Sequence, residues 1–507
     1  MKREAILGID AGTSSVKVCA FSLDGFLIHK VRKPVAIISW KEGYAEIDVL
    51  NYWSLVKQAI KETTQRSDIS IISIGLSTTC PTTVVMDKHL NPLRYGITYL
   101  DNRAAGQIKR FSRHFESEER YVAITGNRMA VSTCSVANLL WIQENEEECW
   151  NKISYVGMLN SFLAGQLTGN MAVDWTQASY SGIFSLHDPI RWNKDLINLA
   201  RIPENILLDI AAPYERIGSV SAGISRETGL PERIPVAIGS ADTAAAAFAI
   251  GFKDPNTAFE SVGTSGVLTF LLEKPIFDPI FMNRCHVLPD RWLSHGAISM
   301  MGGALDWLRH NVWDEYDSPK ELDSLIENAK PGANGVVFLP YLSGERCPIW
   351  NPEAVGVWYG LTLQTKKIDL IESVYESGAF ALRQIFEYAK KNLSCNIDSV
   401  IAVGEGTRSD QWNQIKSDVL DVVYRPTHYS DAAAFGAALM GGIAAGVYSG
   451  IEDKKLPILD LSSRVFKQRE AYIMEAYSRS YRVFTLLYPA LKDVMSVKSD
   501  GFVKSQN

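Results

Sequence analysis

Residues 9–16, Ile9-Asp10-Ala11-Gly12-Thr13-Ser14-Ser15-Val16, and residues 261–267, Ser261-Val262-Gly263-Thr264-Ser265-Gly266-Val267, contain the same short Gly-Thr-Ser motif. Gly263 follows Gly12 by about half of the 507-residue chain. A motif that returns at this spacing divides the protein into two similar halves. The repeat therefore predicts a duplicated fold.

Each copy of the motif has the composition of a phosphate-binding turn. In the first copy an apolar run ends at Gly12, and glycine lets a ligand approach the backbone N–H groups. Thr13 and Ser14 add hydroxyl donors, and Lys17 adds a positive charge. Asp10 is a carboxylate that is suited to hold Mg²⁺ directly or through water. One such turn alone is more often an ordinary hairpin turn, but two copies at half-chain spacing favour a function.

Composition and charge restrict the class of protein. Hydrophobic residues make up 46% of the chain and charged residues 21%, which is typical of a globular protein with two or three domains. The net charge of −6, without a basic stripe, argues against nucleic-acid binding. The longest uncharged stretch, residues 432–448, consists largely of alanine and glycine and is too weakly apolar to span a bilayer. We expect it to form a closely packed internal helix.

Cysteine usage and the N-terminus indicate the compartment. Seven cysteines are scattered without a Cys-x-x-Cys pair or a His–Cys metal spacing, as is usual in a reducing cytosol. Asp10 interrupts the first apolar run too early for a signal peptide. We expect a cytoplasmic protein.

Hydrophobic periodicity predicts an α/β protein in both halves. A domain boundary is expected near residues 249–256, where glycine, proline and asparagine cluster, which gives domains 1–250 and 251–507. Strands are predicted at 5–10, 16–21, 27–31, 69–76, 236–239, 257–261, 267–272 and 399–403, and helices at 49–63, 301–311 and 368–390.

Taken together, these segments resemble the FGGY family of carbohydrate kinases, which belongs to the actin–hexokinase–chaperone ATPase superfamily. The resemblance also rests on residues 239–245 (GSADTAA), 339–348 (LPYLSGERCP), 404–412 (GEGTRSDQW) and 431–446. It implies a two-domain actin/hexokinase-like (ribonuclease H-like) ATPase fold, with a duplicated domain and an interdomain cleft. Domain 1–250 would hold the sugar pocket, the first phosphate turn and the catalytic aspartate. Domain 251–507 would hold the second phosphate turn and the adenosine site.

The resemblance also implies roles for single residues. Asp242 is the candidate general base, although an aspartate there also suits the N-cap of a helix over 243–250. Asp10 is the candidate Mg²⁺ ligand. ATP would contact the two turns and the adenosine site, for which the candidates are Gly12, Thr13, Ser14, Lys17, Gly263, Thr264, Gly303, Gly406, Thr407 and Asp410. In the adenosine turn Glu405 interrupts a run of glycines, so it either alters nucleotide choice or points to solvent.

The sugar pocket is expected within residues 75–87. Glycerol kinases of the family carry Arg-Glu at the positions of Cys80 and Pro81, and xylulokinases carry Met-His. This chain has neither pair, so glycerol is disfavoured as the substrate and these positions do not identify xylulose. Small side chains here leave room for a larger sugar, and a packed thiol is expected for Cys80. The candidates for substrate binding are Thr79, Cys80, Asp101, Arg103, Arg128 and Asp242, with an internal Asp101–Arg103 salt link as the alternative for Arg103.

The sequence thus predicts a kinase that uses ATP and Mg²⁺ to phosphorylate a hydroxyl of a ketose or polyol, with a pentulose such as xylulose as the expected acceptor. A kinase for another sugar, sugar acid or polyol is the alternative within the family. An actin-like chaperone or activator ATPase is the alternative from another class. The expected partners are ATP and a small sugar or polyol, without nucleic acid or membrane, and a homodimer is one assembly that the sequence leaves open.

Overall fold

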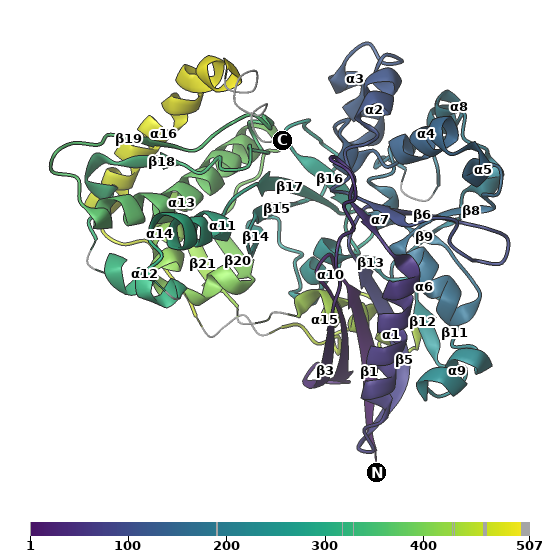
Figure 1. The fold of residues 1–507 in the computed structure, drawn as a ribbon. Coiled ribbons are helices and arrows are strands. Elements are labelled where there is room, and N and C mark those ends of the chain that lie inside the picture. The colour runs from purple at the N-terminus through teal and green to yellow at the C-terminus, as the bar shows by residue number, and fades with distance from the viewer. Residues whose placement is uncertain are drawn as a thin grey trace. The chain divides into compact units, whose positions relative to one another are not determined.

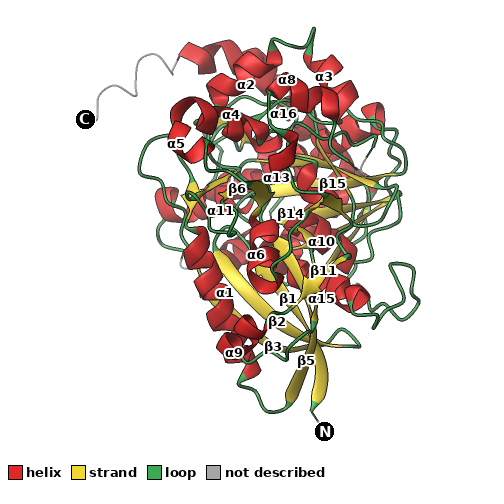
Figure 2. Cartoon of the chain, turned by 90° about the vertical axis from the view of Figure 1, so that its right-hand side faces the viewer, coloured by secondary structure: helices red, strands yellow, loops and turns green. Residues whose placement is uncertain are grey.

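The computed structural model describes residues 2–497 apart from 189–190, 317, 328, 428, 430 and 460–463 (Figures 1 and 2). These residues form two compact units. The first contains the chain up to Phe252, Glu273–Leu293 and Asp431–Leu459, and the second contains the remainder. Two segments beyond the predicted boundary at residues 250–251 therefore belong to the first unit. No helix among the described residues is long and apolar enough to cross a membrane.

The main sheet of the first unit is built around two central strands, β1 and β5. β1 pairs antiparallel with β2 and parallel with β5, and the short β13 pairs parallel with the end of β5. The order is β11-β12-β5-β1-β2-β3, with β1 at Arg3–Ala11, β2 at Ser15–Ser22, β3 at Leu27–Pro34, β5 at Ile69–Thr78, β11 at Arg216–Ser219, β12 at Pro235–Ala237 and β13 at Ser240–Ala241.

Helices α1 (Val49–Thr64) and α15 (Ala432–Ala444) cover opposite faces of this sheet, as Figure 2 shows. Alternate residues of a strand face opposite sides, and Leu7 and Ile9 of β1 join the apolar core that contains α1. Gly8 faces α15 so closely that an added Cβ would lie 1.8 Å from the carbonyl oxygen of Ala434. The predicted internal helix is therefore confirmed, and glycine is required where it meets the sheet.

The second unit repeats the strand pairing of the first. β14 (Thr257–Val262) pairs antiparallel with β15 (Gly266–Leu272) and parallel with β20 (Ser399–Val403), and β20 pairs parallel with β21 (Val423–Pro426). β14, β15 and β20 thus correspond to β1, β2 and β5. This correspondence confirms the predicted duplication, and it places each Gly-Thr-Ser motif at the turn of a hairpin.

The remaining elements of the first unit surround its main sheet. They are β4 (Glu46–Ile47), β6 (Thr82–Met86), β7 (Gly96–Thr98), β8 (Tyr155–Met158), β9 (Val173–Asp174), β10 (Ile210–Ala211), β16 (Met282–Cys285), α2 (Ala105–Ser112), α3 (Glu118–Thr125), α4 (Val136–Asn145), α5 (Glu147–Trp150), α6 (Leu159–Thr168), α7 (Trp175–Ala178), α8 (Lys194–Ala200), α9 (Ala222–Thr228) and α10 (Asp242–Ala249). Those of the second unit are most of β17 (Trp292–Ile298), β18 (Val337–Leu339), β19 (Val357–Tyr359), α11 (Gly302–Trp307), α12 (Pro319–Ile326), α13 (Lys367–Asn392), α14 (Asp410–Leu420) and α16 (Ala471–Val497).

The predicted strands and long helices are present, with small shifts of their ends. One helix differs from its expected form, because the helix predicted at 301–311 is α-helical only to Trp307. It continues as a π-helix over Leu308–Val312, and the N–H of Trp313 bonds to the carbonyl of Leu308. The 3.6-residue pattern of the sequence does not reveal this change of hydrogen bonding.

The close contact between β5 and α15 gives a prediction about stability. Gly75→Ala would place a Cβ 1.8 Å from the carbonyl oxygen of Ala437, so we expect the free energy of unfolding to fall by about 3 kcal/mol in urea titrations. Gly106→Ala in α2 is the control, because its Cβ would meet nothing closer than 3.6 Å, and it should be neutral or slightly stabilising. Equal stability of the two variants would contradict the prediction.

Candidate functional site

Three strand ends meet at one edge of the main sheet in the first unit. Asp10 of β1 and Ser240 of β13 both lie in register with Ser77 of β5. Because the three strands run parallel, their carboxyl ends lie at the same edge, where α/β proteins usually bind ligands. The structure thus brings together Asp10, Thr79 and Asp242, which the sequence places far apart.

Asp10 is a buried carboxylate with few partners. Ser77 donates a hydrogen bond to its Oδ1 at 3.0 Å, and Lys17 Nζ lies 3.5 Å from its Oδ2. Burial raises the pKa of Asp10, Lys17 opposes this shift, and the nearby charge of Asp242 adds to it. The carboxylate therefore lies close to Asp242, and its Oδ2 has only this one long contact with a cation.

Asp242 is the first residue of α10. Ala241 is the N-cap and makes no side-chain capping bond, so the N-cap alternative for Asp242 is not what the structure shows. The Asp242 carboxylate instead accepts hydrogen bonds from the N–H of Thr243 at 2.6 Å and from its hydroxyl at 3.1 Å. Asp242 is partly exposed. It thus stands at the end of β13, with a carboxylate that is not enclosed by the core.

The first Gly-Thr-Ser turn is accessible and is tied to the end of β5. Gly12 and Thr13 are partly exposed, and Ser14 is exposed. The hydroxyl of Thr13 lies 3.2 Å from that of the buried Thr79. Lys17 does not stand free beside the turn, because it lies between Asp10 and Asp431, 3.7 Å from the latter.

Cys80 follows Thr79 and is a protonated thiol. Burial raises its pKa to about 12, so the thiolate needed for a nucleophile is absent near neutral pH. This agrees with the packed thiol expected from the sequence. Cys80 interacts electrostatically with Arg284, which lies over the ring of Tyr180 at 4.2 Å.

Sequence analysis did not identify Arg284 and Tyr180 as site residues. One signal was available, because Arg284 is the only Lys, Arg, Asp or Glu between Asp278 and Asp290. A lone arginine in a stretch without other charged residues needs a partner from elsewhere in the chain. Tyr180, about one hundred residues earlier, shows no such signal.

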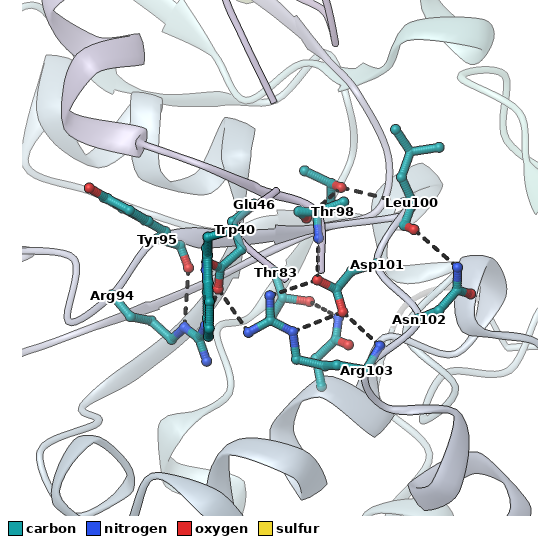
Figure 3. A network of polar contacts seen from close by, with 12 residues as sticks. Trp40, Glu46, Thr83, Arg94, Tyr95, Thr98, Leu100, Asp101, Asn102 and Arg103 are labelled. Carbon is teal, nitrogen blue, oxygen red and sulfur yellow. Dashed lines mark hydrogen bonds and ion pairs between the residues drawn. The ribbon is translucent and has the colours of Figure 1, made fainter. Parts of the chain in front are cut away.

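Asp101 and Arg103 form a salt-bridge network with Glu46 (Figure 3). Arg103 Nε donates to Asp101 Oδ1 at 2.8 Å, and its Nη1 lies 2.8 Å from Glu46. The guanidinium stacks over Tyr44 at 3.8 Å, and Arg94 also pairs with Glu46. The salt link that was left as the alternative for Arg103 is therefore present, and a sugar contact by either residue stays a prediction.

Arg128 is also engaged within the first unit. Its Nη1 donates to the carbonyl of Pro279 at 3.4 Å, and its Nη2 lies 3.6 Å from Glu118. These contacts are long, and the side chain is 18% exposed. A substrate contact for Arg128 also stays a prediction.

In the second unit, the second Gly-Thr-Ser turn is exposed and is braced by the start of α11. Gly263 and Thr264 are both exposed. The N–H groups of Gly302 and Gly303 donate to the carbonyls of Gly263 at 2.9 Å and Thr264 at 3.0 Å. A Cβ on Gly303 would lie 2.8 Å from the Thr264 side chain, so glycine permits this close approach. The N–H of Gly303 is thus already engaged.

The predicted adenosine turn packs against the end of β14. An added Cβ on Gly406 would lie 2.6 Å from the side chain of Val262. The buried Thr407 donates its hydroxyl to the carbonyls of Gly404 at 2.7 Å and Thr427 at 3.0 Å. Two neighbours remain accessible: Glu405 is exposed, and Asp410 is exposed at the start of α14, where it pairs with Arg464.

Glu345 is a buried carboxyl in the loop at 339–348, one of the segments on which the resemblance to the FGGY family rests. Its Oε1 accepts hydrogen bonds from the N–H groups of Ser299 and Arg346, both at 2.7 Å. Its Oε2 is buried without a hydrogen-bond partner among the described residues. Burial raises the pKa of Glu345 to about 7.

Comparison with known proteins identifies the family of this arrangement. The model of the FGGY family of carbohydrate kinases, N-terminal domain, matches residues 5–249, and that of the C-terminal domain matches residues 258–445. A xylulose kinase from Staphylococcus epidermidis is 26% identical over 97% of this chain and 98% of its own. A gluconokinase from Bacillus subtilis is 26% identical over 87% and 88%.

A solved structure has the same fold. The crystal structure of xylulose kinase from Rhodospirillum rubrum matches with a TM-score of 0.89 at 26% identity, covering 97% of this chain and 100% of that one. The predicted two-domain actin/hexokinase-like fold is thereby confirmed.

The buried Glu345 predicts a pH dependence of stability. Its pKa is about 7 in the folded protein, above the usual 4.5, so its protonated form stabilises the fold below pH 4.5 and this contribution is lost as the pH rises through 7. Glu345→Gln should remove that loss, which has a slope of at most about 1.4 kcal/mol per pH unit. Urea titrations between pH 4.5 and 8 give the free energy of unfolding of both proteins at each pH. The same pH dependence of this free energy in both proteins would contradict the prediction.

Proposed function

We propose a role for Asp242 on the basis that the chain belongs to the FGGY family of carbohydrate kinases and is a sugar kinase. In this proposal Asp242 is the general base for phosphoryl transfer from ATP to an acceptor hydroxyl. The observation that carries this proposal is the position of Asp242 at the end of β13. It is partly exposed, and it lies close to the buried Asp10.

Asp242 is suited to take the hydroxyl proton late in the reaction. A carboxylate is too weak a base to deprotonate an alcohol in the ground state, but the hydroxyl becomes acidic as its oxygen bonds to phosphorus. The hydrogen bonds from Thr243 hold the Asp242 Oδ1 atom in place. Its Oδ2 atom can then receive the proton.

ATP and Mg²⁺ are the cofactors of this family, and we assign their phosphate and metal contacts in the first unit to Asp10 and the turn after it. Mg²⁺ prefers oxygen ligands and usually keeps several waters, so a single carboxylate such as Asp10 suffices beside phosphate oxygens. No group of three or more potential metal-binding side chains exists among the described residues. Bound Mg²⁺ neutralises phosphate charge, and Thr13 and Ser14 would donate hydrogen bonds to the phosphates.

In the second unit we assign nucleotide contacts to the exposed turn at Gly263 and Thr264 and to the segment that begins α14. The backbone of Gly406 and the side chain of Asp410 are the accessible groups there. Gly303 and Thr407 would support these loops through the hydrogen bonds they already make.

The acceptor is a small sugar, polyol or sugar acid. A pentulose such as xylulose is the expectation from sequence, and the xylulose kinase relatives support it. The gluconokinase relative supports a sugar acid at the same level of identity. A chaperone or activator ATPase has no support from these relatives.

The proposed role of Asp242 predicts the loss of activity in Asp242→Asn. Removing a general base lowers kcat by about 10²- to 10⁴-fold, measured as acceptor-dependent ADP release across a panel of ketoses, polyols and sugar acids. Asp195→Asn is the matched control, because Asp195 also lies in the first turn of a helix but is exposed on α8. If no acceptor stimulates ADP release by the unmodified protein, the kinase proposal fails.

The assignment of Asp10 predicts that Asp10→Asn lowers activity without lowering stability. Asp10→Asn removes a buried charge, so the thermal midpoint should stay the same or rise, because burial raises the pKa of this carboxyl. Stabilisation by Mg²⁺ and ADP should shrink, and kcat should fall by about 10²-fold. Thermal melts with and without Mg²⁺ and ADP test this, and equal stabilisation of both proteins would contradict the assignment.

A further inference from the structure

Arg284 is a buried cation that is fixed in position by its neighbours on β16. It is 4% exposed. The N–H of Asn283 donates to Asn127 Oδ1 at 2.9 Å, and the N–H of Cys285 donates to Ser179 Oγ at 3.0 Å. The backbone on both sides of Arg284 is thus held within the first unit, and the guanidinium cannot reach water by a small shift of the strand.

The guanidinium lacks the partners that a buried charge requires. Among the described residues, its Nε and Nη1 have no hydrogen-bond acceptor, and the carboxylate that acts on it, that of Asp242, does so from beyond ion-pair distance. The guanidinium lies 4.2 Å from the centre of the Tyr180 ring, and its polar contacts there are with two uncharged groups, the Tyr180 hydroxyl and the Cys80 thiol. Buried polar groups are nearly always satisfied, so a buried guanidinium with two unpartnered nitrogens and only uncharged neighbours in contact indicates a missing anionic ligand.

Arg103 shows that this protein pairs a buried arginine when its role is structural. The Arg103 side chain is 1% exposed, and it contacts Asp101 at 2.6 Å and Glu46 at 2.8 Å. Arg284 is buried to a similar extent but has no such carboxylates. Leaving a guanidinium uncompensated costs several kcal/mol, and the protein would recover this cost when an anion binds.

Arg284 lies near Asp242, the proposed general base, and near Cys80, a substrate-binding candidate from the sequence. It interacts electrostatically with Cys80, Asp242 and Tyr180. Cys80 is a neutral thiol, and the Asp242 carboxylate acts on the guanidinium only through space, so neither neutralises its charge by a direct ion pair. Arg284 is therefore placed to bind a part of the acceptor that is distinct from the reacting hydroxyl.

We propose that Arg284 and Tyr180 bind a carboxylate of the acceptor, so that the substrate is a sugar acid and not a neutral sugar. Both groups offer hydrogen-bond donors, and a carboxylate offers acceptor oxygens with the opposite charge to Arg284. The hydroxyls of a neutral sugar would leave the buried charge uncompensated. This inference rests on the proposed kinase function and selects among its acceptors.

The experiment compares acceptors of equal chain length that differ only in the terminal group. Gluconate is paired with glucitol, and xylonate with xylitol, with xylulose and ribulose 5-phosphate as further arms. ADP release is measured with each acceptor. We expect kcat/KM for the acids to exceed that for their neutral partners by at least about 10-fold, because hydrogen bonds between oppositely charged groups contribute more to binding than those to a neutral hydroxyl.

Three variants test the two residues. Arg284→Gln should lower kcat/KM for the acid by about 10- to 150-fold, mainly through KM, and Tyr180→Phe should have a smaller effect of the same kind. Arg284→Lys should restore part of the affinity, because it keeps the charge. Arg226→Gln, an exposed arginine on α9, is the matched control and should behave like the unmodified protein.

The possible outcomes separate this inference from the kinase proposal. If only neutral acceptors or the sugar phosphate are phosphorylated, the inference is overturned while the kinase function stands. If no acceptor is phosphorylated, the kinase function itself fails. The ratio of kcat/KM between acid and neutral acceptors in the unmodified protein tests the sugar-acid inference even if the Arg284 variants do not fold. An equal loss of kcat/KM for acid and neutral acceptors in Arg284→Gln would overturn the role of Arg284 as the carboxylate ligand.

Discussion

The parallel pairing of β1 and β13 with β5 is the constraint on which the candidate site depends. It sets Asp10 and Ser240 in register with Ser77, and the residues that follow each strand therefore emerge at one edge. Helix α15 packs directly against this sheet, where glycines at positions 8 and 75 leave no room for a side chain. Backbone packing on one side of the sheet thus fixes where the functional carboxylates lie at its end.

Buried charges in this protein fall into two groups, which differ in how they are compensated. Lys416 and Glu260 in the second unit are fully buried and lie 2.8 Å apart, so their desolvation is offset within the fold. Arg103 is compensated in the same way. Asp10 and Arg284, which both lie near Asp242, are buried with incomplete compensation, and so is Glu345 of the second unit, whose Oε2 has no hydrogen-bond partner among the described residues. Near Asp242, a bound ligand of opposite charge would offset the free-energy cost of burying Asp10 and Arg284. We therefore place the metal and the charged group of the acceptor there.

Local patterns predicted the hairpins, the long helices and the position of Asp242, because these depend on residues that are close in sequence. The partners of single side chains could not be predicted. Glu46 lies more than fifty residues from Arg103, and Tyr180 about one hundred from Arg284, so only the fold shows which arginine is paired. The sequence also did not predict that α15 belongs to the first unit. Its alanine and glycine composition predicts close packing but does not identify the surface on which it packs. Roles carried by resemblance, such as those of Asp101 and Arg128, need ligand contacts that neither sequence nor fold supplies.

The two Gly-Thr-Ser turns share a backbone but differ in the charge around them. In the first hairpin Asp10 is paired across the strands with Lys17, whereas in the second Ser261 is paired with Val267. Backbone N–H groups suffice to bind phosphate, so duplication preserves that capacity without any charged side chain. A buried carboxylate is costly to maintain, and it is useful only where a metal or an acceptor must be handled. The retention of Asp10 in one copy therefore agrees with a reaction whose metal and acceptor chemistry belong to the first unit, while the second copy needs only to hold phosphate.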